Sequence, residues 1–237
     1  MKLQNYRIKD ERIRQAFLQS KKEHPEKFHR RIDMSWSNWM FGMEPLQDSA
    51  KRLQKAGLHY IELHGNHYGP DLGYDPKEVL YILGSCDLQV SGIAALFSPD
   101  FDLAGISAIQ RQAAIDYIRR EAEFAAAVHA QYMLVIPSAV GRITPYDPNE
   151  LKRSAATLRC VADVFTEYHI KAAIEPIREA EVSLIHKFAE AKQYIAEVNH
   201  PGVSHINGDV YHMLTEEKHI GEAILDAGDL LLNLHLG

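Results

Sequence analysis

The chain has 237 residues, of which 46% are hydrophobic and 24% are charged. These shares are average for soluble globular proteins and exclude a disordered chain, a collagen-like repeat and a disulfide scaffold, while the length suits one large domain. The formal net charge of -6 gives no overall attraction to nucleic acid or to anionic lipid, and no run approaches the ~20 apolar residues of a membrane span. We therefore expect a globular, cytoplasmic protein that binds neither nucleic acid nor membrane.

The N-terminal segment mixes charged and apolar residues and lacks the continuous apolar core of a secretion signal. We expect residues 1–30 to form an additional charged helix, either outside the domain at 31–237 or covering its bottom.

Seven short β-branched or aliphatic runs then alternate with longer segments whose apolar residues recur at helical spacing, a pattern typical of a parallel sheet. The predicted strands are 31–36, 58–64, 88–96, 131–137, 170–176, 203–209 and 230–236.

Several residues predict where the helices begin and end. Asp75-Pro76-Lys77-Glu78 and Asp147-Pro148-Asn149-Glu150 each offer an aspartate cap, a proline at the first helical position and a glutamate that bonds back. Gly57 and Gly228 each follow a helical pattern and precede a strand, as a left-handed helix cap requires. The two cysteines, Cys86 and Cys160, show no metal-type spacing, and we expect both to be inert core thiols.

Seven strands and six connecting helices, at roughly 30 residues per unit, predict an α/β fold: a TIM (β/α) barrel that stops after its seventh strand. A parallel edge left open at Gly237 would be an association hazard. We therefore expect a shortened gene, a proteolysed product or a partner chain that closes the gap, and we expect a homo-oligomer. An open doubly wound sheet is the rival architecture, but it would need a glycine-rich phosphate turn, and the chain has no GxGxxG.

Three residues with metal-binding side chains fall at the ends of predicted strands five, six and seven. These residues are Glu175, Asp209 and His235. In parallel barrels the active site forms at this end of the strands. Two carboxylates and an imidazole gathered there would be costly without a cation, and the set suits Mn²⁺, Mg²⁺, Co²⁺ or Zn²⁺. Taken singly, each could instead be a loop carboxylate or a hydrogen-bonded core histidine; their positions on successive strands favour a shared metal site.

The motifs around these residues resemble those of the xylose-isomerase-like barrel superfamily of sugar phosphate isomerases and epimerases, above all the ketose 3-epimerases. Glu175-Pro176-Ile177-Arg178-Glu179-Ala180-Glu181 is similar to a Glu-Pro-Leu-Asn-Arg-x-Glu segment on strand five. Asp209-Val210-Tyr211-His212-Met213 is similar to an Asp-x-x-His-Met segment on strand six, and Leu234-His235-Leu236-Gly237 to the start of a strand-seven segment. The resemblance covers roughly residues 31 to 237.

The resemblance implies a role for each matching residue. Glu175 would be both metal ligand and catalytic acid/base, Asp209 and His235 would be metal ligands, and Glu181 and His212 would contact substrate hydroxyls. The implied cofactor is a divalent ion, with manganese expected first. The family's strand-eight glutamate, which is the fourth ligand and second acid/base, has no counterpart here.

The function implied is a metal-dependent isomerase or epimerase acting on a sugar or sugar phosphate. Such an enzyme removes the proton next to a ketose carbonyl, passes through an enediolate and returns the proton. Without the second carboxylate, we expect the 237-residue chain to have little epimerase activity. The alternatives are a non-catalytic sugar- or metal-binding barrel remnant and an apurinic-site endonuclease-like metal hydrolase, which would need further histidines.

Further residues are candidates for substrate contact. His64 ends predicted strand two beside Glu62, where both could contact substrate at the barrel mouth or be solvated loop residues. Trp36 and Trp39 lie near the end of strand one, where their rings could stack on a sugar or cap the barrel's apolar rim. Arg142, after strand four, is the cationic residue suited to a phosphate, or it simply faces water.

Overall fold

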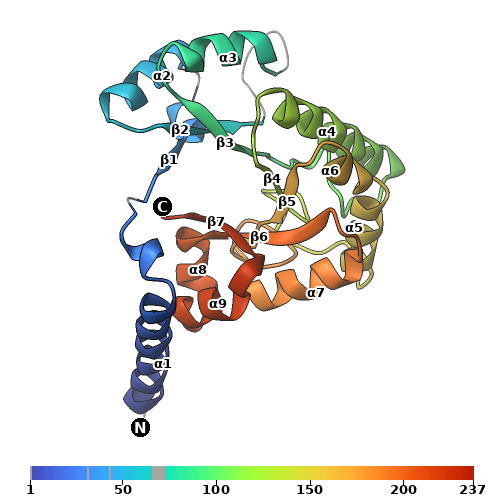
Figure 1. The fold of residues 1–237 in the computed structure, drawn as a ribbon. Coiled ribbons are helices and arrows are strands. Elements are labelled where there is room, and N and C mark those ends of the chain that lie inside the picture. Colours follow the sequence, from blue (N-terminus) through green and yellow to red (C-terminus); the bar gives the residue numbers. More distant parts are fainter. Residues whose placement is uncertain (1, 31, 43, 66–72) are drawn as a thin grey trace.

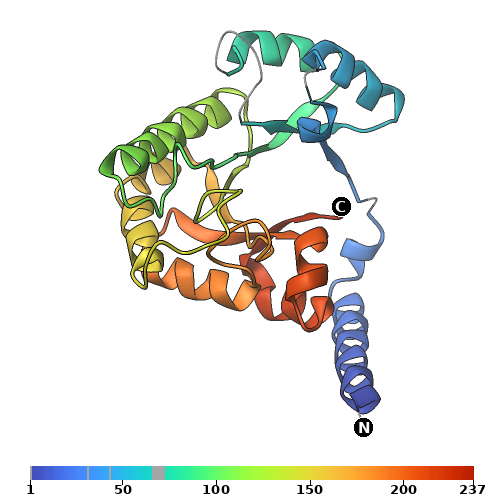
Figure 2. The same cartoon turned by 180° about the vertical axis from the view of Figure 1, so that it is seen from behind.

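The computed structural model describes residues 2–30, 32–42, 44–65 and 73–237. Its helices and strands alternate as the sequence predicts, and the sheet curls with helices along its outer side (Figures 1 and 2). The strands are β1 (Ser35–Ser37), β2 (Tyr60–His64), β3 (Gln89–Ala94), β4 (Tyr132–Val135), β5 (Lys171–Ile174), β6 (Val203–Asp209) and β7 (Leu231–His235). The α-helices are α1 (Lys2–Glu23), α2 (Leu46–Lys55), α3 (Pro76–Gly84), α4 (Ala108–Ala127), α5 (Glu150–Arg159), α6 (Asp163–Glu167), α7 (Phe188–Val198), α8 (Val210–Glu216) and α9 (Ile220–Ala227). Short 3₁₀ turns lie at Pro25–Phe28, Asn38–Phe41 and Gly228–Leu230.

The strands pair in parallel and in chain order from β1 to β7, which confirms the predicted (β/α) barrel topology. Within the described ranges, β1 and β7 form the two edges of this curled sheet. Two connections contain a pair of helices each: α5 and α6 lie between β4 and β5, and α8 and α9 lie between β6 and β7. All strand ends that carry the predicted site therefore belong to one sheet with one direction, so their carboxyl ends meet at one rim.

Side chains alternate between two environments along each strand, as the pleat of a sheet requires. Met133 and Val135 of β4 join the large apolar core between the sheet and its helices. Tyr132 and Leu134 point to the other face, where they pack with Ala94 and Ala173 in a second, small cluster on the inner side. The inner face is therefore partly filled by side chains below the rim.

The N-terminal helix α1 extends away from the barrel and contacts it through α9 (Figure 1). Arg12 of α1 forms ion pairs with Glu222 and Asp226. Ile13 of α1 packs closely on Gly221 of α9: a Cβ added to Gly221 would lie 2.5 Å from Cδ1 of Ile13. The contact surface is largely charged and exposed, so we expect it to add little to stability.

The predicted helix boundaries are confirmed at one site and wrong at another. The side chain of Asp75 accepts a hydrogen bond of 2.9 Å from the backbone N–H of Glu78, with Pro76 as the first residue of α3. The second motif does not form the same cap, because α5 begins only at Glu150. There, Asp147 accepts from the N–H of Asn149 and pairs with Arg153, so the residues before Glu150 form a turn.

The predictions for the glycine caps, the two cysteines and the first strand are also partly confirmed and partly wrong. Gly57 and Gly228 both have positive φ, 73° and 53°, but Gly228 has a ψ of −133° and therefore ends α9 without the left-handed helical conformation predicted for it. Cys86 is buried, but Cys160, which follows the last residue of α5, is exposed, so the expectation of two core thiols is wrong for Cys160. The first strand is shorter than predicted, and Arg31 of that prediction lies outside the described residues. Among the helices that the structure describes, none combines the length and apolar character needed to cross a bilayer.

Candidate metal and sugar site

The side chains predicted to bind a metal lie together at the carboxyl rim of β5, β6 and β7. Glu175 directly follows β5, Asp209 ends β6, and His235 ends β7, where it is the register partner of Asp209. Nδ1 of His235 lies 3.7 Å from Oε1 of Glu175 and 3.9 Å from Oδ2 of Asp209. These separations leave room for one ion between the groups, because direct ligand bonds of about 2.0–2.2 Å to each side are typical of such metals.

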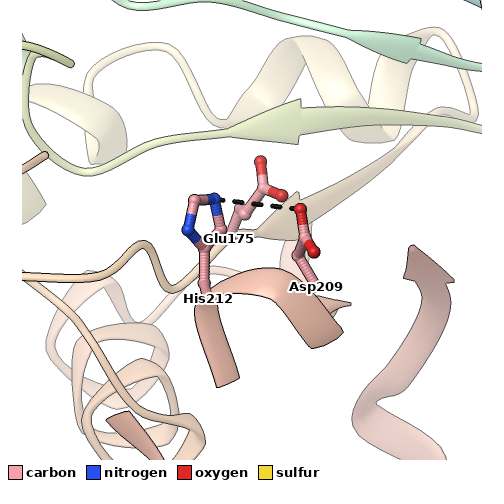
Figure 3. A group of neighbouring side chains, drawn as sticks. All are labelled: Glu175, Asp209 and His212. Atoms are coloured by element: carbon pink, nitrogen blue, oxygen red, sulfur yellow. Dashed lines mark ion pairs between the residues drawn. The ribbon is translucent and has the colours of Figure 1, made fainter. Parts of the chain in front are cut away.

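A second imidazole, that of His212, belongs to the same group. Asp209 caps α8 by accepting a hydrogen bond of 2.8 Å from the N–H of Tyr211, and His212 follows in the first helical turn. Its Nε2 lies 3.8 Å from Oδ2 of Asp209, and Figure 3 shows both side chains turned toward Glu175. Glu175, Asp209 and His212 each offer a ligand atom within 4.8 Å of the others. The sequence places His212 among the substrate contacts, whereas the geometry also allows it to be a ligand.

Residues two positions before Asp209, His235 and His64 form a supporting layer, and the sequence analysis did not predict this role for them. Asn207 donates a hydrogen bond of 2.8 Å to Oε1 of Glu175 and accepts one of 2.9 Å from Asn233. Glu62, two residues before His64 on β2, is 2% exposed, and its Oε2 lies 3.1 Å from Nε2 of His235. Strand periodicity could have found all of them, because residues two apart share a face and point into the same space.

The buried charges shift the protonation of the whole group. Burial raises the pKa of Glu175 to about 7, although the neighbouring His235 opposes this change. Burial also disfavours the charge on His235, but the nearby carboxylates of Asp209 and Glu62 outweigh it and raise the pKa of His235 to about 11. For Asp209, burial is outweighed by His235 and by the N–H of Tyr211, so the pKa of Asp209 is lowered.

The donor set fits a divalent cation. Glu62, Glu175 and Asp209 bring three carboxylates together, and His235 is the imidazole that contacts all of them. Nε2 is the ring nitrogen of His212 that faces this group, 3.8 Å from Oδ2 of Asp209. Excess negative charge in a buried place is relieved when a cation binds, and oxygen and imidazole ligands suit Mn²⁺, Mg²⁺, Co²⁺ or Zn²⁺.

The remaining candidates for substrate contact are placed differently. The carboxylate of Glu181 pairs with Arg178, whose guanidinium lies over the ring of Tyr211, 4.5 Å from its centroid. Glu181 also acts electrostatically on His212, where burial lowers the imidazole pKa and both Glu181 and Asp209 oppose that shift. We therefore place Glu181 at the edge of the metal group.

His64 and Trp36, two aromatic candidates for substrate contact, lie on opposite faces of the sheet. His64 is buried, and its ring lies against Trp39 with 4.0 Å between centroids. Trp36 is the register partner of Ile61, which belongs to the outer core, so Trp36 faces away from Glu62. Its ring is 50% exposed and stacks on Phe41. This placement favours Trp39 over Trp36 as the ring beside the site.

Arg142 neither faces water nor is available to a phosphate. Its guanidinium lies 2.9 Å from Asp102 and 2.6 Å from Glu150, two carboxylates that are fully or almost fully buried. The Arg142 cluster, which we define as Asp102, Arg142, Glu150 and Ser183, joins the loops after β3, β4 and β5. Beside this cluster, the N–H of Gly141 donates a bond of 2.8 Å to the carbonyl of Glu181, so the cluster supports the loop that carries Glu181.

Comparison with known proteins identifies the family of this chain. The model of the family described as "Xylose isomerase-like TIM barrel" matches residues 50–237. The chain belongs to this family.

Two curated relatives are sugar epimerases. The ketose 3-epimerase of Arthrobacter globiformis is 25% identical over 199 residues, which are 83% of this chain and 67% of that enzyme. The 3-dehydro-D-guloside 4-epimerase of Escherichia coli is 31% identical over 112 residues, which are 44% of this chain and 42% of that enzyme. The chain thus spans about two thirds of the first relative's length and less than half of the second's.

A solved structure supports the fold. The D-allulose 3-epimerase from Methylomonas sp., in complex with D-allulose, superposes with a TM-score of 0.77. The superposition covers 88% of this chain and 73% of that chain at 21% sequence identity. At this identity the likeness establishes the shared barrel.

Proposed function

We propose that this protein is a divalent-metal-dependent isomerase or epimerase that acts on a sugar or sugar phosphate, with Mn²⁺ as the preferred ion. The observation that carries the proposal is the convergence of Glu175, Asp209, His212 and His235 at one rim of the barrel. The curated relatives named above, a ketose 3-epimerase and a dehydrosugar 4-epimerase, support sugar chemistry at this rim.

In this proposal Glu175, Asp209 and His235 hold the ion. Nδ1 of His235 supports this choice because it lies within 4 Å of both carboxylates. His212 remains beside Asp209 and contacts the substrate's hydroxyl groups, together with Glu181. When bound, the ion supplies positive charge that stabilises the negative charge developing on a substrate oxygen.

Glu175 is the proposed acid/base. It is buried, it accepts a hydrogen bond from Asn207 that fixes one carboxylate oxygen, and it lies at the end of a rigid strand. In the ionised form it takes the proton from the carbon next to the substrate carbonyl and returns it later. A carboxylate in one place serves one face of the sugar, so inversion also requires a proton donor on the opposite face.

Hydrogen exchange tests proton abstraction separately from epimerisation. The protein loaded with Mn²⁺ is incubated in D₂O with D-fructose or D-allulose, and deuterium next to the carbonyl is measured by NMR and mass spectrometry. We expect the wild-type protein to incorporate deuterium and Glu175→Gln to lose incorporation by at least about 100-fold, the usual contribution of a general base. Glu121→Gln, which changes another buried glutamate in α4, serves as the matched control.

Metal binding identifies the ligands in a second experiment. Calorimetric titration with Mn²⁺ should give one ion per wild-type chain, with a larger loss of affinity in His235→Ala than in His212→Ala. His200→Ala, which removes an imidazole bonded to Asp163 outside the site, is the control. The reverse order of the two losses would exchange the roles of His212 and His235. Binding of one Mn²⁺ without any exchange would replace the enzyme proposal with a sugar- or metal-binding barrel.

A further inference from the structure

Glu62 is a buried carboxylate that the proposed reaction does not use. It lies on the inner face of β2 and is 2% exposed. Its Oε2 accepts a hydrogen bond of 2.7 Å from the hydroxyl of Tyr132 on β4 and lies 3.1 Å from Nε2 of His235 on β7. Because β3, β4, β5 and β6 lie between β2 and β7 in the sheet, this contact crosses the inner space of the curled sheet and joins β7 to the strand next to the opposite edge.

The contacts of the His235 ring assign different tasks to its two nitrogens. Nε2 faces Glu62, whereas Nδ1 faces Glu175 and Asp209. An ionised carboxylate only accepts hydrogen bonds, so Nε2 must carry the proton in this contact. Nδ1 is then the nitrogen that gives up its proton and offers a lone pair when a cation binds, and it is the nitrogen that faces the other two ligands.

Tyr132 fixes the position of Glu62 in turn. Burial raises the pKa of the Tyr132 phenol, so the hydroxyl keeps its proton and donates it to Glu62. The ring of Tyr132 lies over Gly92 of β3, where an added Cβ would be 2.2 Å from the ring. A series of close contacts therefore runs from Gly92 of β3 through Tyr132 of β4 and Glu62 of β2 to His235 of β7.

We propose that Glu62, held by Tyr132, is a positioning residue that orients His235 so that Nδ1 is its metal-binding nitrogen. The inference rests on the proposed function only in taking His235 as a ligand. A carboxylate that accepts from the second nitrogen fixes the ring orientation and increases the electron density at the ligating nitrogen, and its loss typically costs 10- to 100-fold in metal affinity. In this role Glu62 acts through His235.

The test measures Mn²⁺ affinity by calorimetry for the wild-type protein, Glu62→Gln, Glu62→Leu and Tyr132→Phe. Glu62→Leu removes the acceptor, and we expect it to lose about 10- to 100-fold in affinity. Glu62→Gln keeps an acceptor oxygen and should recover part of that loss, which a purely space-filling role would not predict. Glu121→Gln and Tyr194→Phe, which change another buried glutamate and a buried tyrosine bonded to Ser154, should keep wild-type affinity.

A spectroscopic measurement identifies the nitrogen itself. In protein labelled with ¹⁵N-histidine and loaded with Zn²⁺, long-range ¹H–¹⁵N NMR should show one ring with a metal-bound Nδ1 and a protonated Nε2. His235→Ala assigns that ring by removing its signals. In Glu62→Leu we expect this pattern to be lost or mixed.

Tyr132→Phe retains the carboxylate of Glu62 and should give an intermediate loss of Mn²⁺ affinity. This variant keeps the test valid if Glu62→Leu does not fold.

The outcomes separate this inference from the proposed function. If the wild-type protein binds neither Mn²⁺ nor Zn²⁺, the metal site is wrong and the positioning role falls with it. If the wild-type protein binds one ion but Glu62→Leu and Tyr132→Phe bind it equally well through the same nitrogen, the metal site stands and the positioning role is wrong. Coordination through Nε2 in the wild-type protein would also overturn the inference.

Discussion

The Arg142 cluster provides a quantitative test of how the rim loops are stabilised. Arg142 is the cation of a buried network in which Asp102 is 0% and Glu150 is 1% exposed. Arg142→Met keeps most of the side-chain volume but leaves both carboxylates without their counterion. Removing one partner of a buried ion pair costs about 3–5 kcal/mol, because an uncompensated charge remains in a low-dielectric place.

Local hydrogen bonds limit this cost. Asp102 still accepts from the backbone N–H groups of Ala104 and Ala139, at 2.9 and 3.2 Å, and Glu150 still accepts from Ser183 at 2.5 Å. We therefore expect Arg142→Met to lower the free energy of unfolding by about 3 kcal/mol, the lower end of that range. For a chain of this size the melting temperature should fall by roughly 6–12 °C.

Urea unfolding followed by circular dichroism measures the change, with differential scanning calorimetry as the second method. Adding Asp102→Asn to Arg142→Met removes one of the uncompensated charges and should restore part of the lost stability. Arg12→Met, which breaks the exposed ion pairs between α1 and α9, is the control and should cost less than about 1 kcal/mol. If Arg142→Met unfolds within 1 kcal/mol of the wild-type protein, the cluster does not hold the rim loops together and the reasoning is refuted.

Three further changes test separate parts of the structure. Gly92→Ala forces a Cβ into the ring of Tyr132 and should destabilise the protein by about 1–3 kcal/mol in urea unfolding; an unchanged midpoint would contradict the tight packing. Asp75→Ala removes the α3 cap and should cost about 1 kcal/mol, whereas no loss would mean that Pro76 alone defines the helix start. Burial raises the pKa of Glu121 to about 7, partly offset by Arg120, so the folded state holds this proton more tightly and stability falls as the pH rises from about 4.5 to 7. Glu121→Gln should abolish that decrease and be more stable than wild type by up to about 3 kcal/mol at pH 8, with no gain at pH 4; equal pH dependence in both proteins would disprove it.

The sequence predicted the order and number of the described strands because each strand carries its own signal. Runs such as 131–137 and 170–176 are apolar enough to be buried and short enough to be strands, and the intervening helices show one apolar stripe. The parallel topology follows from this alternation, since parallel neighbours need a crossover between them. Helix starts were less certain: Asp75 caps its helix, while Asp147 in the same motif is engaged by Arg153.

The sequence alone also indicated the place of Glu175, Asp209 and His235, because residues at the carboxyl ends of parallel strands share a rim whatever the details of packing. Only the tertiary structure brought Glu62 and Tyr132 to His235, turned Trp36 away from the site and paired Arg142 with buried carboxylates. These contacts join residues up to 173 positions apart. The physical reason is that a strand's period and direction are local properties of the chain, whereas the partner of a buried charge depends on how far the sheet curls and which strands then face one another.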